Sequence, residues 1–205
     1  MKNIKVKVCG ITDEKNYCDL KKYPISYFGF IFYKKSPRYI FKNNRISFIK
    51  DIPNKVAVFV NEDFKEVLRI SKEYNFSIVQ LHGNESDSYC KRLKGAGLKI
   101  IKSHSIKDLN DFNKINLNNT DFNLFDYKSK LFGGSGNFFD WDLLNRISIK
   151  KKYFLSGGIS LENFKNIKKI NCNKYLYALD LNSKFEKYPG YKDVNLIDKL
   201  FNIML

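Results

Sequence analysis

Residues 4–9 read Ile4-Lys5-Val6-Lys7-Val8-Cys9, and the run stops at Gly10. Apolar and basic side chains alternate along it, which predicts a strand with one face turned toward a core. Thr12 is the predicted N-cap of a following helix, because two acidic residues come next, where the first helical turn would lie. A cysteine is therefore expected at the carboxyl end of a strand, just before a helix N-terminus.

Cys9 is the first candidate for chemistry. Backbone N–H groups and the dipole at a helix N-terminus lower the pKa of a nearby thiol, so this position favours a thiolate. An inert core cysteine is the alternative, since free cysteine is among the most buried residue types. The choice depends on whether the rest of the chain supplies partners for the thiol.

Further apolar runs follow residues 4–9, and most have a helix-like segment behind them. Alternating strands and helices predict a parallel sheet, and eight such units in 205 residues match the lower size of a closed barrel. The sequence thus predicts an α/β fold, a single-domain (β/α)8 TIM barrel over residues 1–205, with a doubly wound open sheet as the alternative. The predicted strands are 4–9, 25–32, 56–60, 76–82, 98–102, 122–126, 153–156 and 175–180, and the predicted helices include 12–22, 43–49, 63–74, 85–93 and 107–115.

Five of these apolar runs end on a polar side chain. In a (β/α)8 barrel the carboxyl ends of the strands lie together on the face where active sites are built. Each residue alone is explained as an ordinary loop or cap residue, but five together predict a site. They are Cys9, His82, Asp126, Ser156 and Asp180.

Glycine-rich loops follow several strands. Gly157-Gly158 lets the backbone approach a ligand closely, and a helix predicted to begin near Ser160 would present N–H groups suited to a phosphate. Asp180-Leu181-Asn182-Ser183 forms a second polar turn, after the last strand. Barrels commonly bind phosphate in these two loops. Gly133–Gly136 lacks the ending of a P-loop and is interpreted as a mobile cover over the site.

The chain is strongly basic, with 37 Lys+Arg against 21 Asp+Glu and a formal charge of +16. Such an excess suits a nucleic acid, an acidic membrane or an anionic substrate. The lysines are spread over the whole length, and the aromatic residues fall inside strand-like runs. We therefore expect no nucleic-acid partner, and a basic RNA- or DNA-binding protein remains the alternative from another functional class.

The cysteines and the apolar segments bear on the cell compartment. The four cysteines are widely spaced and form no paired metal-ligand pattern, so we expect free thiols and no metal. No run resembles a secretory signal or is long enough to span a bilayer. The sequence predicts a cytoplasmic protein with no membrane partner.

Several motifs together resemble the phosphoribosylanthranilate isomerase family of tryptophan biosynthesis. They occur in the family's order, at compatible spacing, over nearly the whole chain. Cys-Gly-Ile-Thr and Ser-Pro-Arg-Tyr are the specific strings. The matching segments are 7–12, 29–32, 36–39, 80–83, 125–126, 133–136, 155–159 and 180–193.

The resemblance implies an Amadori rearrangement, which converts an aminoaldose to an aminoketose without a cofactor. It makes Cys9 the general base and Asp126 the general acid. Protonation of the ribose ring oxygen by Asp126 opens the sugar to an imine, and the Cys9 thiolate then removes the proton from C2. An acid and a base of different kinds can coexist near neutral pH, so the assignment is chemically coherent.

The resemblance also implies a phosphorylated aminosugar substrate and a monomer or homodimer. Arg38 would meet the anthranilate carboxylate, while Gly158, Asn182 and Ser183 would hold the phosphate. Lys184 departs from the family, which often has glycine there, and adds a charge near the phosphate. The aminoaldose isomerase of histidine biosynthesis is the alternative enzyme. A resemblance to that family would imply a mechanism with two aspartates, and Cys9 at the end of the first strand argues against it. The implied substrate-binding residues are Arg38, Gln80, His82, Gly134, Gly157, Gly158, Asp180, Asn182 and Ser183.

Overall fold

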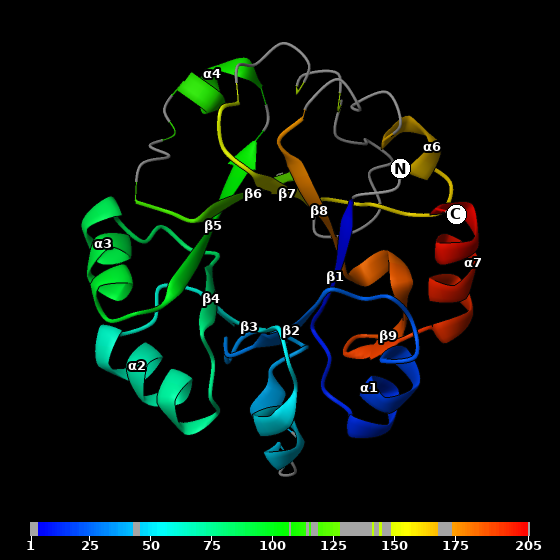
Figure 1. The fold of residues 1–205 in the computed structure, drawn as a ribbon, viewed down its shortest axis with the longest axis horizontal. Coiled ribbons are helices and arrows are strands. Elements are labelled where there is room, and N and C mark those ends of the chain that lie inside the picture. The colour runs from blue at the N-terminus through cyan, green and yellow to red at the C-terminus, as the bar shows by residue number, and fades with distance from the viewer. Residues whose placement is uncertain are drawn as a thin grey trace.

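The chain folds into a closed barrel of eight parallel strands surrounded by helices (Figure 1). The structure is a computed structural model. It describes residues 4–42, 46–106, 108–113, 115, 119–127, 141, 144, 149–167 and 174–204. Strands follow one another around the barrel in sequence order, and the last pairs with the first. The predicted TIM barrel is confirmed, and the doubly wound open sheet is excluded.

The eight predicted strands are all present, with boundaries that differ by a few residues. The barrel strands are β1 (Lys5–Cys9), β2 (Tyr27–Ile31), β3 (Lys55–Phe59), β4 (Ile78–Leu81), β5 (Lys99–Ile106), β6 (Phe122–Tyr127), β7 (Tyr153–Leu155) and β8 (Leu176–Leu181). The helices are α1 (Glu14–Leu20), α2 (Phe64–Glu73), α3 (Asp87–Gly95), α4 (Leu109–Asn113), α6 (Phe164–Ile167) and α7 (Val194–Met204). Short 3-10 turns cover Ile40–Lys42, Ser47–Asp51 and η4 (Ser183–Phe185).

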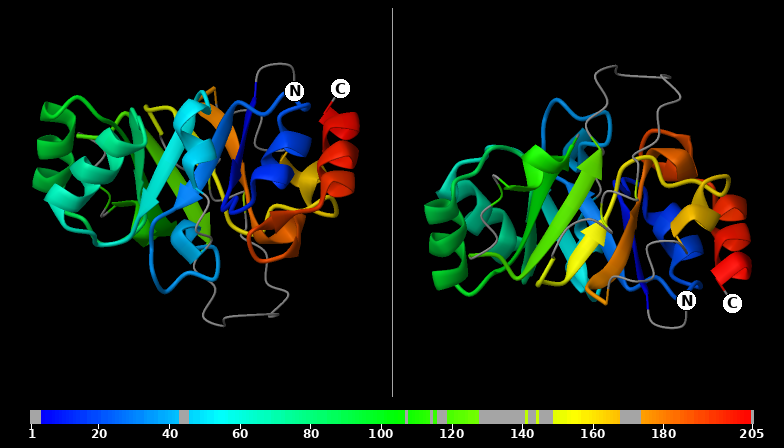
Figure 2. Two further views of the ribbon diagram at one scale, coloured as in Figure 1. Left: turned by 90° about the horizontal axis from the view of Figure 1, so that it is seen from below. Right: turned by 90° about the horizontal axis from the view of Figure 1, so that it is seen from above.

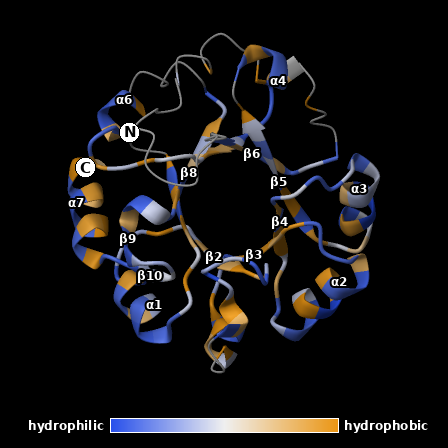
Figure 3. Cartoon of the chain, turned by 180° about the vertical axis from the view of Figure 1, so that it is seen from behind, coloured by the Kyte–Doolittle hydropathy of each residue, from blue (hydrophilic) through white to orange (hydrophobic). Residues whose placement is uncertain are grey.

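Two apolar layers stabilise the barrel. One lies between the strands and the outer helices, and the other fills the barrel interior, as expected when successive side chains alternate across each strand. The helices carry both hydrophilic and hydrophobic residues, which suits elements with one face on the barrel and one in water (Figure 3). In side view the helices lie on the outside of the barrel, alongside its strands (Figure 2).

The first strand corrects the prediction of a half-exposed β1. Val6 and Val8 pack outward in the layer under the helices. The alternate positions, Lys7 and Cys9, point into the barrel, and both are buried. Lys5 at the start of β1 is exposed, but from Val6 to Cys9 the alternation separates two buried environments, because both faces of the strand are covered there.

The start of the first helix also differs from the prediction. Asp13, and not Thr12, is the N-cap of α1: its carboxylate accepts a hydrogen bond from the backbone N–H of Asn16 at 2.7 Å. The Thr12 hydroxyl instead donates to the carbonyl oxygen of Gly190 at 3.1 Å. A carboxylate is a strong cap and adds a favourable charge at the helix N-terminus.

A small hairpin follows β8 and was not predicted. Its strands are β9 (Glu186–Tyr188) and β10 (Tyr191–Lys192), which pair antiparallel. Gly190, with φ +95°, makes the turn between them. Asn16 of α1 fixes the hairpin, because its side chain both donates to the carbonyl oxygen of Lys192 and accepts from its N–H. This hairpin brings two charged side chains to the carboxyl end of the barrel.

Candidate active site

A pocket of about 410 Å³ opens at the carboxyl ends of the barrel strands. All five polar strand-end residues predicted to meet there line it. The other lining residues come from strands β2, β3 and β4 and from the segments after β2, β3, β7 and β8. The pocket is lined by Cys9, Ile31, Tyr33, Ser36, Val58, Val60, Gln80, His82, Asp126, Ser156, Gly157, Gly158, Ile159, Asp180, Asn182, Ser183 and Lys184.

Two predicted site residues are not on this wall. Arg38 lies beside the pocket, behind Gly10: a side-chain carbon added at Gly10 would come within 2.6 Å of the Arg38 Cδ. Gly134, with the rest of the predicted cover at 133–136, lies outside the described residues. Every other predicted site residue lines the pocket.

Cys9 lies on the floor of the pocket, at the end of β1, with 4% of its surface exposed. Its neighbour across the strand pair is Gly29, where an added side-chain carbon would come within 2.7 Å of the Cys9 sulfur. The glycine therefore provides the space that the thiol occupies. A bulkier residue at position 29 would displace the sulfur.

The electrostatics of Cys9 differ from the prediction. Burial raises the pKa of the thiol above its ordinary value, while the charge of Lys7 opposes that effect. The expected lowering by the helix N-terminus is wrong, because desolvation of the thiolate outweighs it. A thiolate at Cys9 therefore depends on the positive charges around it.

Lys7 supplies the nearest of these charges. It is fully buried, two residues before Cys9 on the same inward face of β1. Its Nζ donates to Oδ1 of Asp180 at 2.8 Å, and Asp180 is itself 6% exposed. This pairing keeps the pKa of Lys7 above its ordinary value although burial acts in the opposite direction.

His82 faces the predicted general acid. Its Nε2 lies 3.4 Å from Oδ2 of Asp126. On the other side of the ring, Nδ1 lies 3.0 Å from the side-chain amide of Gln80. The ring of His82 is therefore held between Gln80 and Asp126, with one nitrogen toward each.

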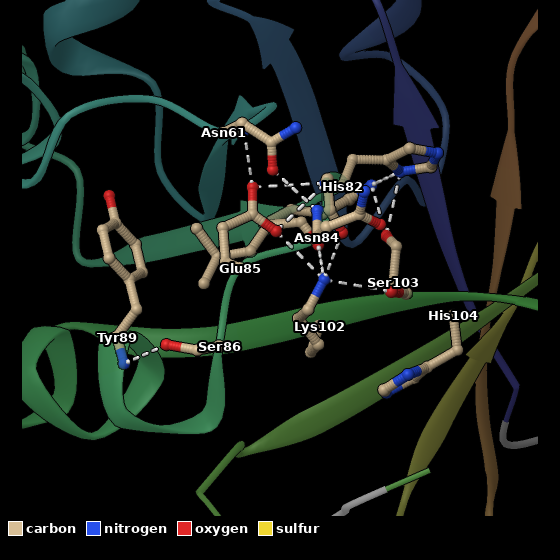
Figure 4. A network of polar contacts seen from close by, with 12 residues as sticks. Asn61, His82, Asn84, Glu85, Ser86, Tyr89, Lys102, Ser103 and His104 are labelled. Atoms are coloured by element: carbon tan, nitrogen blue, oxygen red, sulfur yellow. Dashed lines mark hydrogen bonds and ion pairs between the residues drawn. The ribbon is translucent and has the colours of Figure 1, made fainter. Parts of the chain in front are cut away.

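A wider polar network holds His82 in place (Figure 4). The Ser103 hydroxyl lies 2.9 Å from Nδ1 of His82. Lys102, the residue before Ser103 on β5, donates to the carbonyl oxygen of Gly83 at 2.7 Å and to Glu85 at 3.0 Å. Glu85 also accepts from the backbone N–H of Asn61 at 2.8 Å. The loop after β4 is thereby tied to both β5 and the loop after β3.

A second charged cluster lies where the β9–β10 hairpin meets the pocket. Glu186 accepts from Nε and Nη2 of Arg38, the latter at 2.6 Å, and from Nζ of Lys192 at 2.5 Å. Burial opposes ionisation of Glu186, yet the two cations hold its pKa below the ordinary value. Burial lowers the pKa of Lys192 to about 8. Lys192 also donates to Oδ1 of Asn182 at 2.8 Å, which links this cluster to the pocket wall.

The loop after β7 differs in detail from the predicted phosphate cradle. The helix begins at Phe164 instead of near Ser160, and the N–H of Ser160 donates to the side chain of Asn163 at 2.8 Å. Gly157 and Gly158 have φ of +90° and +73°. An added side-chain carbon at Gly158 would meet nothing within 4 Å, so its backbone lies open toward the pocket.

The described residues contain no helix that is long and apolar enough to cross a membrane. In the same ranges no three histidine, cysteine, aspartate or glutamate side chains gather as a metal site would require.

Comparison with known proteins identifies the family. Residues 6–203 match the model of the N-(5'-phosphoribosyl)anthranilate (PRA) isomerase family. The chain belongs to this family. It is an isomerase of tryptophan biosynthesis, as the motifs in the sequence indicated.

Individual PRA isomerases agree with this assignment. The enzyme of Parabacteroides distasonis is 36% identical over 205 residues, covering 97% of this chain and 91% of its own. The crystal structure from Thermotoga maritima matches with a TM-score of 0.82 and 31% identity, over 97% of both chains. A PRA isomerase in complex with reduced 1-(o-carboxyphenylamino)-1-deoxyribulose 5-phosphate matches with a TM-score of 0.77 and 29% identity, over 95% of this chain and 94% of that one.

Sequence reasoning missed several charged residues of this PRA isomerase fold. Lys7 was read as part of an exposed face, although its position two residues before Cys9 gives it the same inward direction. Glu186 and Lys192 lie in a short hairpin with no strong strand pattern. The signal available for Lys7 was its spacing of two residues from Cys9 on one strand. For the hairpin the only signal was the family resemblance of segment 180–193, which gave Glu186 and Lys192 no role.

Proposed function

We propose that this pocket converts N-(5'-phosphoribosyl)anthranilate to 1-(2-carboxyphenylamino)-1-deoxyribulose 5-phosphate by an Amadori rearrangement, with Cys9 as general base and Asp126 as general acid. The observation that supports this most is that both side chains line one pocket from different strands, β1 and β6. A substrate held between them meets a proton donor and a proton acceptor at separate atoms.

The reaction runs through ring opening, removal of the C2 proton and a final tautomerisation. The carboxylic acid of Asp126 gives its proton to the ribose ring oxygen, the C1–O bond breaks, and the aminosugar opens to an imine. The Cys9 thiolate then takes the proton from C2, and the electron pair moves to form an enolamine. The enolamine then gains a proton at C1 while the C2 hydroxyl loses its proton, which gives the ketone, so atoms balance without an external oxidant or reductant.

His82 serves this chemistry as a positioning residue. Gln80 and Ser103 hold one side of its ring, and Nε2 on the other side lies 3.4 Å from Oδ2 of Asp126, where it orients that carboxyl group.

Different residues would hold the two ends of the substrate. The open backbone at Gly157 and Gly158, with Ser183, suits the phosphate. Arg38 suits the anthranilate carboxylate: its Nε and Nη2 bind Glu186, while Nη1 takes part in no hydrogen bond among the described residues. Glu186 thereby fixes the direction of the free edge of the guanidinium.

The test is an assay with the purified full chain. N-(5'-phosphoribosyl)anthranilate is generated in place, and the appearance of the carboxyphenylamino-deoxyribulose phosphate is followed by chromatography. Formation of this product in proportion to enzyme concentration is expected. Absence of product from a folded preparation would contradict the proposal. Light scattering on the same sample tests the expected monomer or homodimer, and cell fractionation tests the expected cytoplasmic location.

A further inference from the structure

A lysine sealed inside the barrel needs an explanation beyond stability. Lys7 has 0% of its side chain exposed, and its register partner on β8 is Asp180, to which it donates at 2.8 Å. A buried ion pair is often replaceable by apolar residues of similar size with no loss of stability. The pair therefore does not follow from the needs of the fold alone.

The surroundings of Lys7 indicate what the charge does. Lys7 and Cys9 enter the barrel interior from alternate positions of the same strand, and both are buried. The positive charge of Lys7 acts to lower the pKa of the Cys9 thiol, against the effect of burial. The other charged groups that act on Cys9 are Asp180 on β8 and Lys192 on β10. From β2 the neighbour is Gly29, which has no side chain. Of the two cations, Lys7 acts more strongly on the thiol than Lys192 does.

Other polar groups of the pocket surround the Lys7–Asp180 pair. Asp180 lines the same pocket as His82 and Asp126. Its hydrogen bond with the Lys7 ammonium fixes where that ammonium lies inside the barrel. A negative charge on Cys9 would otherwise form in a desolvated site, at high cost.

We propose that Lys7 is a positioning residue for the catalytic base: its ammonium, held in place by Asp180, provides the positive charge against which the Cys9 thiolate forms. This inference rests on the proposed function, in which Cys9 removes the C2 proton. Lys7 transfers no proton itself; it stays an ammonium while Cys9 passes between thiolate and thiol.

The test measures the ionisation of Cys9 and does not depend on turnover. The ultraviolet absorbance of the thiolate is titrated against pH, and the same titration of the Cys9→Ser form of each protein is subtracted to remove tyrosines and other thiols. In Lys7→Met the midpoint for Cys9 should move upward, with roughly a tenfold or greater loss of thiolate at a fixed pH below it. In Asp180→Asn the midpoint should move downward, because a negative charge is lost while Lys7 remains.

Two further variants complete the design. Lys7→Met leaves Asp180 buried without its cation and risks misfolding, so Lys7→Met/Asp180→Asn removes both charges and keeps both shapes. Its midpoint should still move upward, since Lys7 acts on Cys9 more strongly than Asp180 does. Lys102→Met is the matched control: Lys102 is 8% exposed and paired with Glu85 at 3.0 Å, on β5. It should leave the midpoint unchanged.

An unchanged Cys9 midpoint in the folded double variant would overturn the proposal, and so would an equal shift in Lys102→Met. Failure of the proposed function gives a different result. In that case Cys9→Ser keeps its turnover, or no isomerisation is seen, while the titrations still report whether Lys7 controls the thiol.

Discussion

Positive charge gathers at both ends of this barrel, in two different ways. At the carboxyl ends of the strands, Lys7 binds Asp180, and Arg38 and Lys192 share Glu186. At the amino ends, a hollow of about 570 Å³ is lined by five lysines, Lys99, Lys150, Lys151, Lys152 and Lys174, with Asp121, Phe122 and Tyr175. The carboxyl-end cations are mostly buried and fixed by carboxylates, whereas four of the five amino-end lysines are exposed.

The comparison indicates that the buried cations at the carboxyl end serve the chemistry, whereas the exposed lysines at the amino end serve solvation. A buried cation is costly to maintain and is retained where a carboxylate fixes it and a reacting group uses it. Exposed lysines cost little and contribute little beyond solubility and a general attraction for anions. The high net charge of the chain therefore says less about its function than the few lysines that lie inside it.

The largest expected effect is at the proposed acid and base. Cys9→Ser keeps the size of the side chain but offers a hydroxyl that does not ionise near neutral pH, and Asp126→Asn has no carboxylic proton to give. Each should lower kcat by roughly 10²–10⁴-fold and leave KM within a few-fold. Steady-state kinetics measure this, with circular dichroism to verify folding.

Cys90→Ser is the matched control, since Cys90 is a buried thiol on α3, away from the pocket. It should keep its kcat. Near-wild-type kcat in folded Cys9→Ser would show that Cys9 only fills the core. The buried cations at the carboxyl end would then have no reacting thiol to serve.

The next effect tests the space around the thiol. Gly29→Ala places a carbon within 2.7 Å of the Cys9 sulfur, so the sulfur must move. A displacement of about 1 Å at a reacting atom can cost roughly 10²-fold in rate, and a fall in kcat of that size is expected. Gly95→Ala is the control, because an added carbon there meets nothing within 4 Å. Equal kcat in the two variants would show that the position of Cys9 is not critical.

A smaller effect is expected at Lys184, which lines the pocket beside Ser183. If its charge assists the phosphate, Lys184→Gly should raise KM a few-fold with little change in kcat, because the phosphate binds alike in ground and transition states. Lys187→Gly, an exposed lysine of the hairpin that is not among the lining residues, should leave KM unchanged. An unchanged KM in Lys184→Gly would mean that this lysine points into solvent.

The smallest effect is expected at the amino end. Lys150→Gln/Lys152→Gln should keep kcat and KM, because these exposed lysines lie at the end opposite the pocket. The wild-type chain should retain random duplex DNA only weakly at physiological salt, with affinity falling steeply as salt rises. Sub-micromolar retention under those conditions would make the amino-end hollow a functional surface.

The eight strands were predictable because buried parallel strands are short apolar runs with little ambiguity, as residues 27–31 and 55–59 illustrate. The gathering of Cys9, His82, Asp126, Ser156 and Asp180 followed from the barrel topology. The raised pKa of Cys9 could not be predicted from its place before a helix, because it depends mainly on how deeply the folded barrel buries the thiol. The pairing of Arg38 with Glu186 joins residues 148 positions apart and needs the folded chain.

The division of labour between Cys9 and Asp126 is tested most directly by a primary isotope effect on kcat, with substrate deuterated at C2 of the ribose. In Cys9→Ser the removal of the C2 hydrogen should limit the rate, so the account predicts a full primary effect. In Asp126→Asn the ring opening should limit the rate, and no C2–H bond breaks in that step, so the account predicts none. A full effect in Asp126→Asn together with none in Cys9→Ser would contradict the assignment of base and acid.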